Sequence, residues 1–360
     1  MERRPTLETV AELAAVSRQT VSNVLNSPHL VRPQTIARVQ AVIDELGYRP
    51  HGAARQLRTR RSNVIGLRLE RAVDGINGAV LDRFLHSLTE LAQVRGYRVM
   101  LFTAPDDGGE IVQYAELLDV LEVDAFVLTS THAGDPRTRW LTEHDVPFVT
   151  FGRPWEPSDA DGSQPDHAWV DVDGSAGTRA AVEHLASLGH TDIAFIGWPA
   201  GSGVGDDRRA GWRRAMVAAG MPAHRLDALD VATVDGVAQG AEAARRLIEM
   251  VSPTAFVCAS DSLALGALAA VRTDGVLPGA DEGAAAVVGF DDTPVANAVG
   301  LSSVAQPLTE AADRALGLLL ARLAAPTDGP TRRTGRGTPT DQQVLLAPSL
   351  VVRDSSRPRP

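Results

Sequence analysis

The chain has 360 residues, of which 44% are apolar, with a formal net charge of −10 and one cysteine, Cys258. This length exceeds what a single compact domain usually holds, so we expect two or three domains with sizeable hydrophobic cores. A lone cysteine excludes an intramolecular disulfide and a cysteine-based metal cluster. Because no apolar run reaches the roughly 18 residues that span a bilayer, and the N-terminus lacks an apolar signal core, we expect a cytoplasmic protein with no membrane partner.

The charged residues are distributed unevenly along the chain. Residues 1–62 carry ten arginines against five acidic side chains, whereas the remainder carries 25 basic and 40 acidic residues. A basic head on an acidic body indicates that the head binds phosphate groups, as in nucleic acid, while the body is repelled by them.

Three short helices are predicted within residues 1–48. Thr6 can cap the first helix and Ser17 the second, because their hydroxyl groups can accept a free amide of the first turn. The third helix starts with Pro33 at its first position and stops at Gly47, where a left-handed conformation favours glycine. The apolar residues that recur at helical spacing are Leu7, Val10, Ala11, Ala14, Val21, Val24, Leu25, Ile36, Val39, Val42, Ile43 and Leu46.

Two short helices joined by a tight turn predict a helix-turn-helix, whose second helix enters the major groove of DNA. The outward side chains of that helix include Arg18, which can pair with guanine, and Gln19 and Asn23, which can pair with adenine. The pattern alone leaves a second possibility open, a generic three-helix bundle whose polar face is only solvated.

The head resembles the headpiece of the LacI/GalR repressors in four segments. These are residues 6–11, 16–26, 46–50 and 53–57, which read TLETVA, VSRQTVSNVLN, LGYRP and AARQL. The resemblance implies a DNA-binding headpiece at residues 1–48. The DNA-binding residues that it implies are Thr6, Ser17, Arg18, Gln19, Thr20, Ser22, Asn23, Asn26, Tyr48, Arg55 and Leu57.

The same resemblance implies a hinge helix and linker at residues 49–62 that fold on the operator. Leu57 matches an apolar wedge that enters a base step of the minor groove, and Ala54 matches the small residue where two hinge helices pack. Gly52 departs from the family pattern and costs a helix about 0.8–1 kcal/mol relative to alanine. We therefore expect a hinge that is mostly disordered in the absence of DNA.

From Val64 onward, short apolar runs alternate with helical segments, which predicts parallel sheets with right-handed crossovers. The expected strands are residues 64–69, 99–103, 125–128, 148–151, 169–172, 193–197, 255–259, 286–289, 343–346 and 350–353. The fold class is therefore a small all-α helix-turn-helix headpiece followed by an α/β core of two doubly wound parallel-sheet lobes. The runs GHTDIAFIG, RAGW, ASDSLALG and VGFDDT extend the resemblance over nearly the whole chain. They imply a periplasmic-binding-protein-like core.

We expect this effector-binding and dimerisation core to span residues 63–360. A Pro/Asp/Gly-rich interruption at residues 155–167 separates two series of strands. It suggests an N-lobe of about 63–160 plus 293–324 and a C-lobe of about 161–292 plus 325–353. The three crossings between the lobes are then expected near residues 155–167, 292–303 and 325–342.

Ligands of open α/β sheets bind beyond the carboxyl ends of the strands. Arg153, Asp171, Ser260 and Asp291 fall at such positions. The resemblance adds Arg208 as an arginine that holds effector oxygens and Gln306 as a cleft glutamine, and it assigns Asp291 to effector hydroxyls and Ser260 to a polar position of the cleft. With Trp155, Trp169 and Trp198 as aromatic plates, these groups suit a neutral polyol such as a sugar.

Other chemistry-bearing residues have simpler interpretations. Residues expected to be structural or solvated are Trp212, Leu263, Asp261, Asp292, Asp207 and Arg209. The glycine-rich run at 201–205 lacks dinucleotide spacing and a P-loop lysine, so we expect a flexible loop beside the cleft. There is no Gly-x-Ser-x-Gly elbow and no histidine spacing of a metal site, which argues against an enzyme, a metal or a cofactor.

The sequence therefore predicts a homodimeric repressor that binds a pseudo-palindromic double-stranded DNA operator. A sugar effector would change the distance between the hinge segments and release the protein from DNA. Two alternatives stay open. One is a purine- or nucleoside-responsive regulator that is co-repressed by its ligand. The other is a sugar-binding protein without DNA function, which would need a signal peptide in place of the basic head.

Overall fold

The computed structural model describes residues 5–48, 61–70, 78–120, 122–155, 167–272, 285–324 and 342–356. The chain forms two compact units, a head of residues 1–62 and a core of residues 63–360. The expected hinge helix lies almost entirely outside the described residues, which resume at Arg61. Among the described residues, no helix is both long and apolar enough to cross a bilayer.

Within residues 5–48, the head consists of three α-helices and one short 3-10 helix around a small apolar core. The helices are α1 (Leu7–Leu13), α2 (Arg18–Asn26), η1 (Pro28–Leu30) and α3 (Pro33–Leu46). Thr6 caps α1 and Ser17 caps α2. Gly47 ends α3 in the left-handed region at φ +58°. Together with Pro33 at the first position of α3, these features confirm the predicted start and stop signals of the head.

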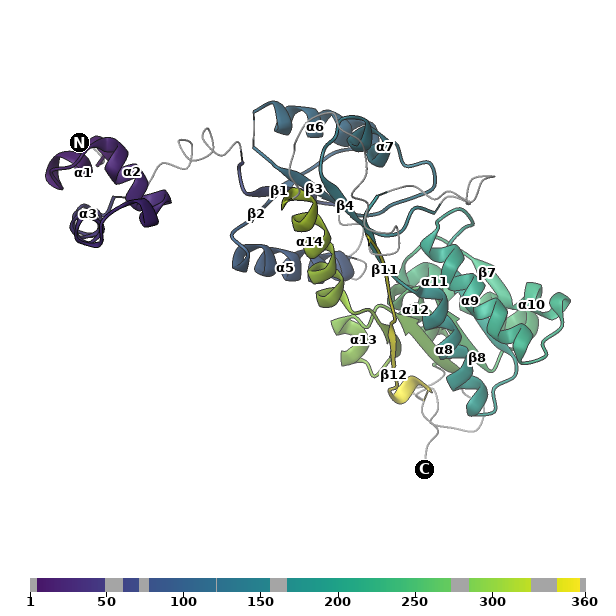
Figure 1. The fold of residues 1–360 in the computed structure, drawn as a ribbon. Helices are drawn as coiled ribbons and strands as arrows, with labels where there is room; N and C mark the ends of the chain where they lie inside the picture. Colours follow the sequence, from purple (N-terminus) through teal and green to yellow (C-terminus); the bar gives the residue numbers. More distant parts are fainter. Residues whose placement is uncertain are drawn as a thin grey trace. The chain divides into compact units, whose positions relative to one another are not determined.

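The core contains two six-stranded sheets, each with helices packed on it (Figure 1). The first sheet has the order β11-β5-β4-β3-β1-β2, and all of its pairs are parallel. Its strands are β1 (Val64–Arg68), β2 (Arg98–Phe102), β3 (Ala125–Leu128), β4 (Phe148–Phe151), β5 (Trp169–Val172) and β11 (Gln343–Leu346). Its helices are α5 (Gly78–Val94), α6 (Asp107–Asp119), α7 (Pro136–Glu143) and α14 (Leu308–Ala324). We call these elements the first lobe.

The second sheet has the order β12-β10-β9-β8-β6-β7, and only β12 runs antiparallel to its neighbour. Its strands are β6 (Ile193–Gly197), β7 (Asp230–Ala232), β8 (Ala255–Cys258), β9 (Ala286–Phe290), β10 (Ser302–Ala305) and β12 (Ser349–Val351). Its helices are α8 (Gly174–Ser187), α9 (Val204–Ala218), α10 (Ala223–Leu229), α11 (Val237–Val251), α12 (Asp261–Val271), α13 (Pro294–Ala298) and η3 (Asp354–Ser356). We call these elements the second lobe.

The two lobes confirm the expected fold class, but the expected bounds of the lobes are wrong in three places. β5 and β11 belong to the first sheet, although both were expected in the C-lobe, and β10 belongs to the second. The chain therefore crosses after β5, after β10 and between β11 and β12. A change in composition marks a loop, but it does not say which sheet the next strand joins. That choice depends on long-range pairs such as Thr150 with Trp169.

Two strands were not expected at all. β7 has only three residues, and β10 reads Ser302-Ser303-Val304-Ala305, without the apolar alternation of a strand. Both serines are nevertheless buried, because their hydroxyl groups are paired. Ser303 donates to Asp261 at 2.6 Å, and Ser302 donates to the carbonyl of Arg353 at 3.1 Å. Satisfied hydrogen bonds let a polar strand occupy the interior of a sheet.

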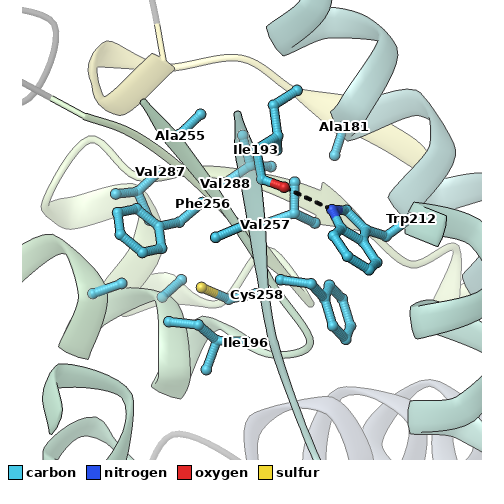
Figure 2. Close-up of a cluster of buried hydrophobic side chains, with 14 of the residues drawn as sticks. Ala181, Ile193, Ile196, Trp212, Ala255, Phe256, Val257, Cys258, Val287 and Val288 are labelled. Carbon is cyan, nitrogen blue, oxygen red and sulfur yellow. Dashed lines mark hydrogen bonds between the residues drawn. The ribbon is translucent and has the colours of Figure 1, made fainter. Parts of the chain in front are cut away.

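The second lobe contains a large cluster of buried apolar side chains (Figure 2). Trp212 of α9 is fully buried there, and its indole donates to the carbonyl of Ile193 at 3.0 Å. Leu263 of α12 is also fully buried. Both residues pack helices onto the sheet, as predicted, and this lobe supplies a rigid support for the residues at its strand ends.

Candidate functional site

The second helix of the head presents a polar face. Arg18 and Gln19 are exposed on α2, and Ser22 and Asn23 are half-buried beside them. Gln19 donates to the side-chain oxygen of Asn23 at 3.0 Å, and Arg18 forms an exposed ion pair with Glu8 at 3.4 Å. An exposed pair of this kind is worth at most about 1 kcal/mol, so Arg18 can exchange Glu8 for an acceptor on DNA. This face carries the side-chain types that read guanine and adenine.

Three hydroxyl residues of the expected DNA-binding set hold the helix ends. The hydroxyl of Thr6 accepts from the amide of Thr9 at 3.2 Å, and the hydroxyl of Ser17 accepts from the amide of Thr20 at 3.0 Å. Ser17 and Thr20 also bond through their hydroxyl groups at 2.8 Å. These bonds fix the first turn of α2 and thereby the direction in which Arg18 and Gln19 project.

Tyr48, another residue of the expected DNA-binding set, lies in the core of the head. Its side chain is only 6% exposed and belongs to the apolar core of the head, where burial raises the pKa of its phenol. The left-handed Gly47 turns the chain back onto the bundle, so that the amide of Tyr48 donates to the carbonyl of Ile43 at 3.0 Å. Tyr48 therefore packs against α3, and its contact with DNA stays a prediction. Arg55, Leu57 and the side chain of Asn26 lie outside the described part of the structure.

The core contains a cavity of about 190 Å³ that is lined by both lobes. The lining residues follow the carboxyl ends of β3, β4, β5, β9 and β10, with α5, α8 and α9 completing the wall. They are Val80, Leu81, Ser130, Thr131, Phe151, Gly152, Trp155, Asp171, Val172, Gly174, Val204, Asp207, Arg208, Phe290 and Gln306. The cavity lies where ligands of open α/β sheets bind, and four of the expected effector residues line it.

Arg153 connects the two lobes beside this cavity. Its guanidinium donates to Asp171 at 2.6 Å and to the carbonyl of Val172 at 3.3 Å, both in β5 of the first lobe. It also donates to Asp207 of α9 in the second lobe at 3.2 Å. Burial raises the pKa of Asp207, and the charge of Arg153 opposes that rise. Arg153, which follows β4, therefore bridges the two lobes. The sequence predicted Arg153 at the site but did not predict this bridge.

Arg208 lies in the wall of the cavity with its side chain 6% exposed. Its guanidinium stacks on the ring of Phe290 at 3.7 Å, donates to the carbonyl of Ala259, and forms an ion pair with Asp291 at 3.5 Å. Its Nε is buried and has no hydrogen-bond acceptor among the described residues. A planar cation held in this way is preorganised to receive ligand oxygens.

Asp291 lies behind Arg208 and accepts from the amide of Gln306 at 2.7 Å. Burial raises the pKa of its carboxyl group to about 7, although Arg208 and Gln306 act in the opposite direction. The backbone of Asp291 has φ +108°, and the next residue, Asp292, has φ +48°. Two consecutive non-glycine residues in this region are strained. Asp292 forms an ion pair with Arg353 at 2.6 Å, which helps to hold the turn.

The three expected aromatic plates differ in their positions. Trp155 lines the cavity, stacks on the guanidinium of Arg153 at 4.7 Å and lies against Gly203 of the second lobe. Trp198 lies behind Arg208, with 5.3 Å between its ring and that guanidinium. Trp169 is not part of the lining, because it occupies the amino end of β5 whereas the cavity lies at the carboxyl end. The structure therefore does not bring Trp169 to the cavity.

Ser260 also does not line the cavity. Its hydroxyl accepts from the amide of Leu263 as the cap of α12 and donates to Asp235 at 2.5 Å. Asp261, the next residue, is fully buried and accepts from the amide of Thr293 at 2.7 Å. The two residues thus fix the start of α12 and the turn after β9, which places Asp291 against Arg208.

The sequence missed three polar residues of the cavity wall, which are Ser130, Thr131 and Asp207. Asp207 was expected to be solvated, yet it follows Val204 by three residues and precedes Arg208, so that all three share one face of α9. Helical spacing would have revealed this. Thr131 gave no signal, because it lies in an irregular segment after β3. Its hydroxyl donates to the carbonyl of Arg153 at 3.0 Å.

One cluster in the first lobe has the composition of a metal site. Asp107, His132 and Asp135 bring one ligand atom each within 4.8 Å of one another. Arg137, however, donates to Asp135 at 2.7 Å and lies 3.5 Å from Asp107. The carboxylates are thus already neutralised by a guanidinium, which repels a divalent cation. We assign no metal to this cluster.

Comparisons with known proteins agree with this architecture. Residues 6–51 match the family of bacterial regulatory proteins described as the lacI family, and residues 182–356 match a periplasmic binding protein-like domain. The HTH-type transcriptional regulator CelR of Thermobifida fusca is 35% identical to this chain, over 98% of each sequence.

Two solved structures carry the same fold. The complex of the transcriptional regulator CelR with cellobiose is 31% identical, covers 98% of this chain and 100% of that chain, and superposes with a TM-score of 0.66. The Lac repressor dimer bound to operator and the anti-inducer ONPF is 24% identical, covers 98% of this chain and 99% of that chain, and has a TM-score of 0.76. The chain therefore belongs to the LacI family of bacterial transcriptional regulators.

Proposed function

We propose that this chain is a cytoplasmic repressor whose cavity binds a neutral sugar. It binds a pseudo-palindromic operator as a homodimer, acts by binding rather than by catalysis, and leaves the operator when the sugar occupies the cavity. The cavity supports this proposal more directly than any other feature, because it joins the two lobes that a ligand must reposition.

The observation that carries the proposal is a pair of buried N–H groups that lack a hydrogen-bond acceptor among the described residues. Trp155 Nε1 and Arg208 Nε are buried, belong to residues that line the cavity from different lobes, and have no acceptor among the described residues. An unpaired buried donor costs about 1–3 kcal/mol, and hydroxyl oxygens of a ligand would remove that cost. A ligand that satisfies both donors at once favours one arrangement of the lobes over others.

The charges of the cavity favour an uncharged ligand. Arg153 is matched by Asp171 and Asp207, and Arg208 is matched by Asp291. Each guanidinium of this set already faces a carboxyl group, so the cavity offers no excess positive charge to a phosphate or carboxylate on the ligand. The indole of Trp155 offers an apolar plate for the face of a pyranose ring. Because the related CelR structure contains cellobiose, this disaccharide is the first probe.

A thermal-shift panel tests the proposal directly. Cellobiose, maltose, glucose and ribose are compared with glucose 6-phosphate, guanine, hypoxanthine and adenosine on the purified full chain. A ligand at 100 times its Kd should stabilise the protein by about 2.7 kcal/mol. The sugar that stabilises the protein in this panel should also release it from an operator selected from a random duplex pool. Stabilisation by purines alone, with tighter operator binding, would favour a co-repressed regulator instead.

Arg208→Ala is the test variant for this panel. The variant should keep its operator affinity and lose about 1–3 kcal/mol of sugar binding, because ligand oxygens lose a charged donor. The control substitution is Arg213→Ala, on the same helix, where the arginine forms an exposed pair with Asp227. A wild-type midpoint of sugar response in Arg208→Ala would remove Arg208 from the site.

A further inference from the structure

A buried arginine of the first lobe sits at the centre of a charge network. Arg137 is 1% exposed in the first turn of α7. Its guanidinium donates to both carboxylate oxygens of Asp135, at 2.9 and 2.7 Å, and to Glu110 of α6 at 2.9 Å. The same group donates to the backbone carbonyls of Thr129 and Ser130, at 3.2 and 3.1 Å. All of its donor nitrogens are therefore engaged within the first lobe.

Glu110 fixes the position of Arg137 from the other side. This carboxylate is 1% exposed and also accepts from Arg68 of β1 at 2.6 Å and from the hydroxyl of Tyr114 at 2.5 Å. The network thus connects β1, α6 and α7 through one guanidinium. Removing a partner from such a buried network leaves an uncompensated charge, so the arrangement is fixed rather than adaptable.

The two carbonyls that Arg137 holds lead directly into the cavity wall. Ser130 has a left-handed backbone, with φ +55°, and Ser130 and Thr131 both line the cavity. Thr131 in turn donates to the carbonyl of Arg153, and a side chain at Gly152 would overlap the Thr131 hydroxyl. The contacts therefore run from Arg137 through Ser130 and Thr131 to the residue that bridges the lobes.

We infer that Arg137 is a positioning residue of the effector site, acting through the segment Ser130–Thr131 on the Gly152–Arg153 turn. The guanidinium supplies the carbonyl bonds that hold Ser130 in a conformation that a serine rarely adopts. That conformation aims Thr131 at Arg153. The inference relies on the proposed function only for the identity of the ligand, because the geometry of the wall can be measured without any sugar.

Hydrogen–deuterium exchange of the full chain, in the absence of ligand, tests this inference. Arg137→Lys keeps the charge, but a single ammonium cannot serve two carboxylates and two carbonyls at once. Thr131→Val removes the bond to Arg153 and leaves the buried charges intact. The amide of Gly152, which donates to Val170 at 2.8 Å, reports on the turn. In both variants we expect exchange in residues 150–155 to rise about threefold to tenfold, as expected for the loss of one hydrogen bond.

Arg225→Lys is the control, because this arginine joins Asp192 and the carbonyl of Val251 within the second lobe. It should leave residues 150–155 unchanged. Wild-type exchange of that segment in either test variant would overturn the inference. So would a rise of equal size in β1 and β2, or loss of the circular-dichroism signal in Arg137→Lys, since each marks a general role in the fold. Failure of every sugar in the panel would overturn the proposed function and leave this result standing.

Discussion

At the scale of single residues, substitutions on the polar face of α2 can distinguish contacts with bases from contacts with phosphates. We expect Arg18→Ala to weaken binding to the selected operator by about 1–3 kcal/mol more than binding to random duplex, because a bidentate arginine discriminates between bases. Arg38, exposed on α3, is the matched control, since its loss removes the same charge from another helix. Fluorescence anisotropy with both DNAs measures the difference. Equal losses on both DNAs would place Arg18 on the phosphates.

A second residue-scale prediction concerns pH. Burial raises the pKa of Asp291 to about 7, whereas an aspartate in an unfolded chain titrates near pH 3.9, as a rough reference. Between about pH 4 and 7, the folded protein holds a proton that the unfolded chain has released. The stability from this proton is present below about pH 4 and is lost as the pH rises through 7. We therefore expect the free energy of unfolding to decrease from pH 5 to pH 8.

Asp291→Asn should remove part of this decrease. Asp261, whose pKa burial raises to about 6, remains in the variant and should account for the rest. Urea unfolding at constant ionic strength, followed by the fluorescence of the tryptophans in the core, measures both proteins across this range. A variant with the wild-type slope would show that Asp291 is ionised throughout.

At the scale of elements, glycines set the spacing of α11 and α12. A side chain at Gly266 would overlap the carbonyl of Val237 and the amide of Ala241, both of which are backbone groups. The two helices can separate only by disturbing the sheet beneath them. Gly266→Ala should therefore cost about 1–3 kcal/mol, as overpacked cores do. The midpoint of urea unfolding, at an unchanged m-value, measures this loss.

Gly317 of α14 provides the control for that substitution. It is an exposed helical glycine with no atom within 4 Å of the position of an added Cβ. Gly317→Ala should therefore be neutral or should stabilise the protein by up to about 1 kcal/mol, the difference in helix propensity. If both alanines had the same effect, close packing of α11 on α12 would not explain Gly266.

At this scale the sequence predicted only part of the fold. Caps, the left-handed Gly47 and the apolar strands were all predictable, because each depends on a few neighbouring residues. The partners of β5, β10 and β11 were not, because strand pairing depends on residues far apart in the chain. The same division applies to the site. The rule that ligands bind beyond the carboxyl ends of the strands predicted Asp171. The position of Thr131, in contrast, depends on the guanidinium of Arg137.

At the scale of the whole molecule, the uneven charge predicts how operator binding responds to salt. The basic head supplies arginines to the phosphates, and the acidic body contributes none of this attraction. The logarithm of the association constant should fall linearly with the logarithm of salt concentration, by about 0.9 per phosphate neutralised. Titration of the full chain from 50 to 300 mM salt measures the slope, and Arg38→Ala should reduce it by about one. A slope near zero would contradict binding through the head.

The chain enters the second sheet from the first and later returns, and β11 and β12 are separated by only two residues although each completes a different sheet. Neither sheet can therefore gain its last edge strand until the end of the chain has left the ribosome, because β11 and β12 lie in the same short segment. Proteolytic removal of residues 342–356 would expose an inner strand of each lobe at once, β5 in one and β10 in the other. Exposed inner strands template aggregation. Loss of this segment should thus make the protein insoluble as a unit, rather than liberate one folded lobe.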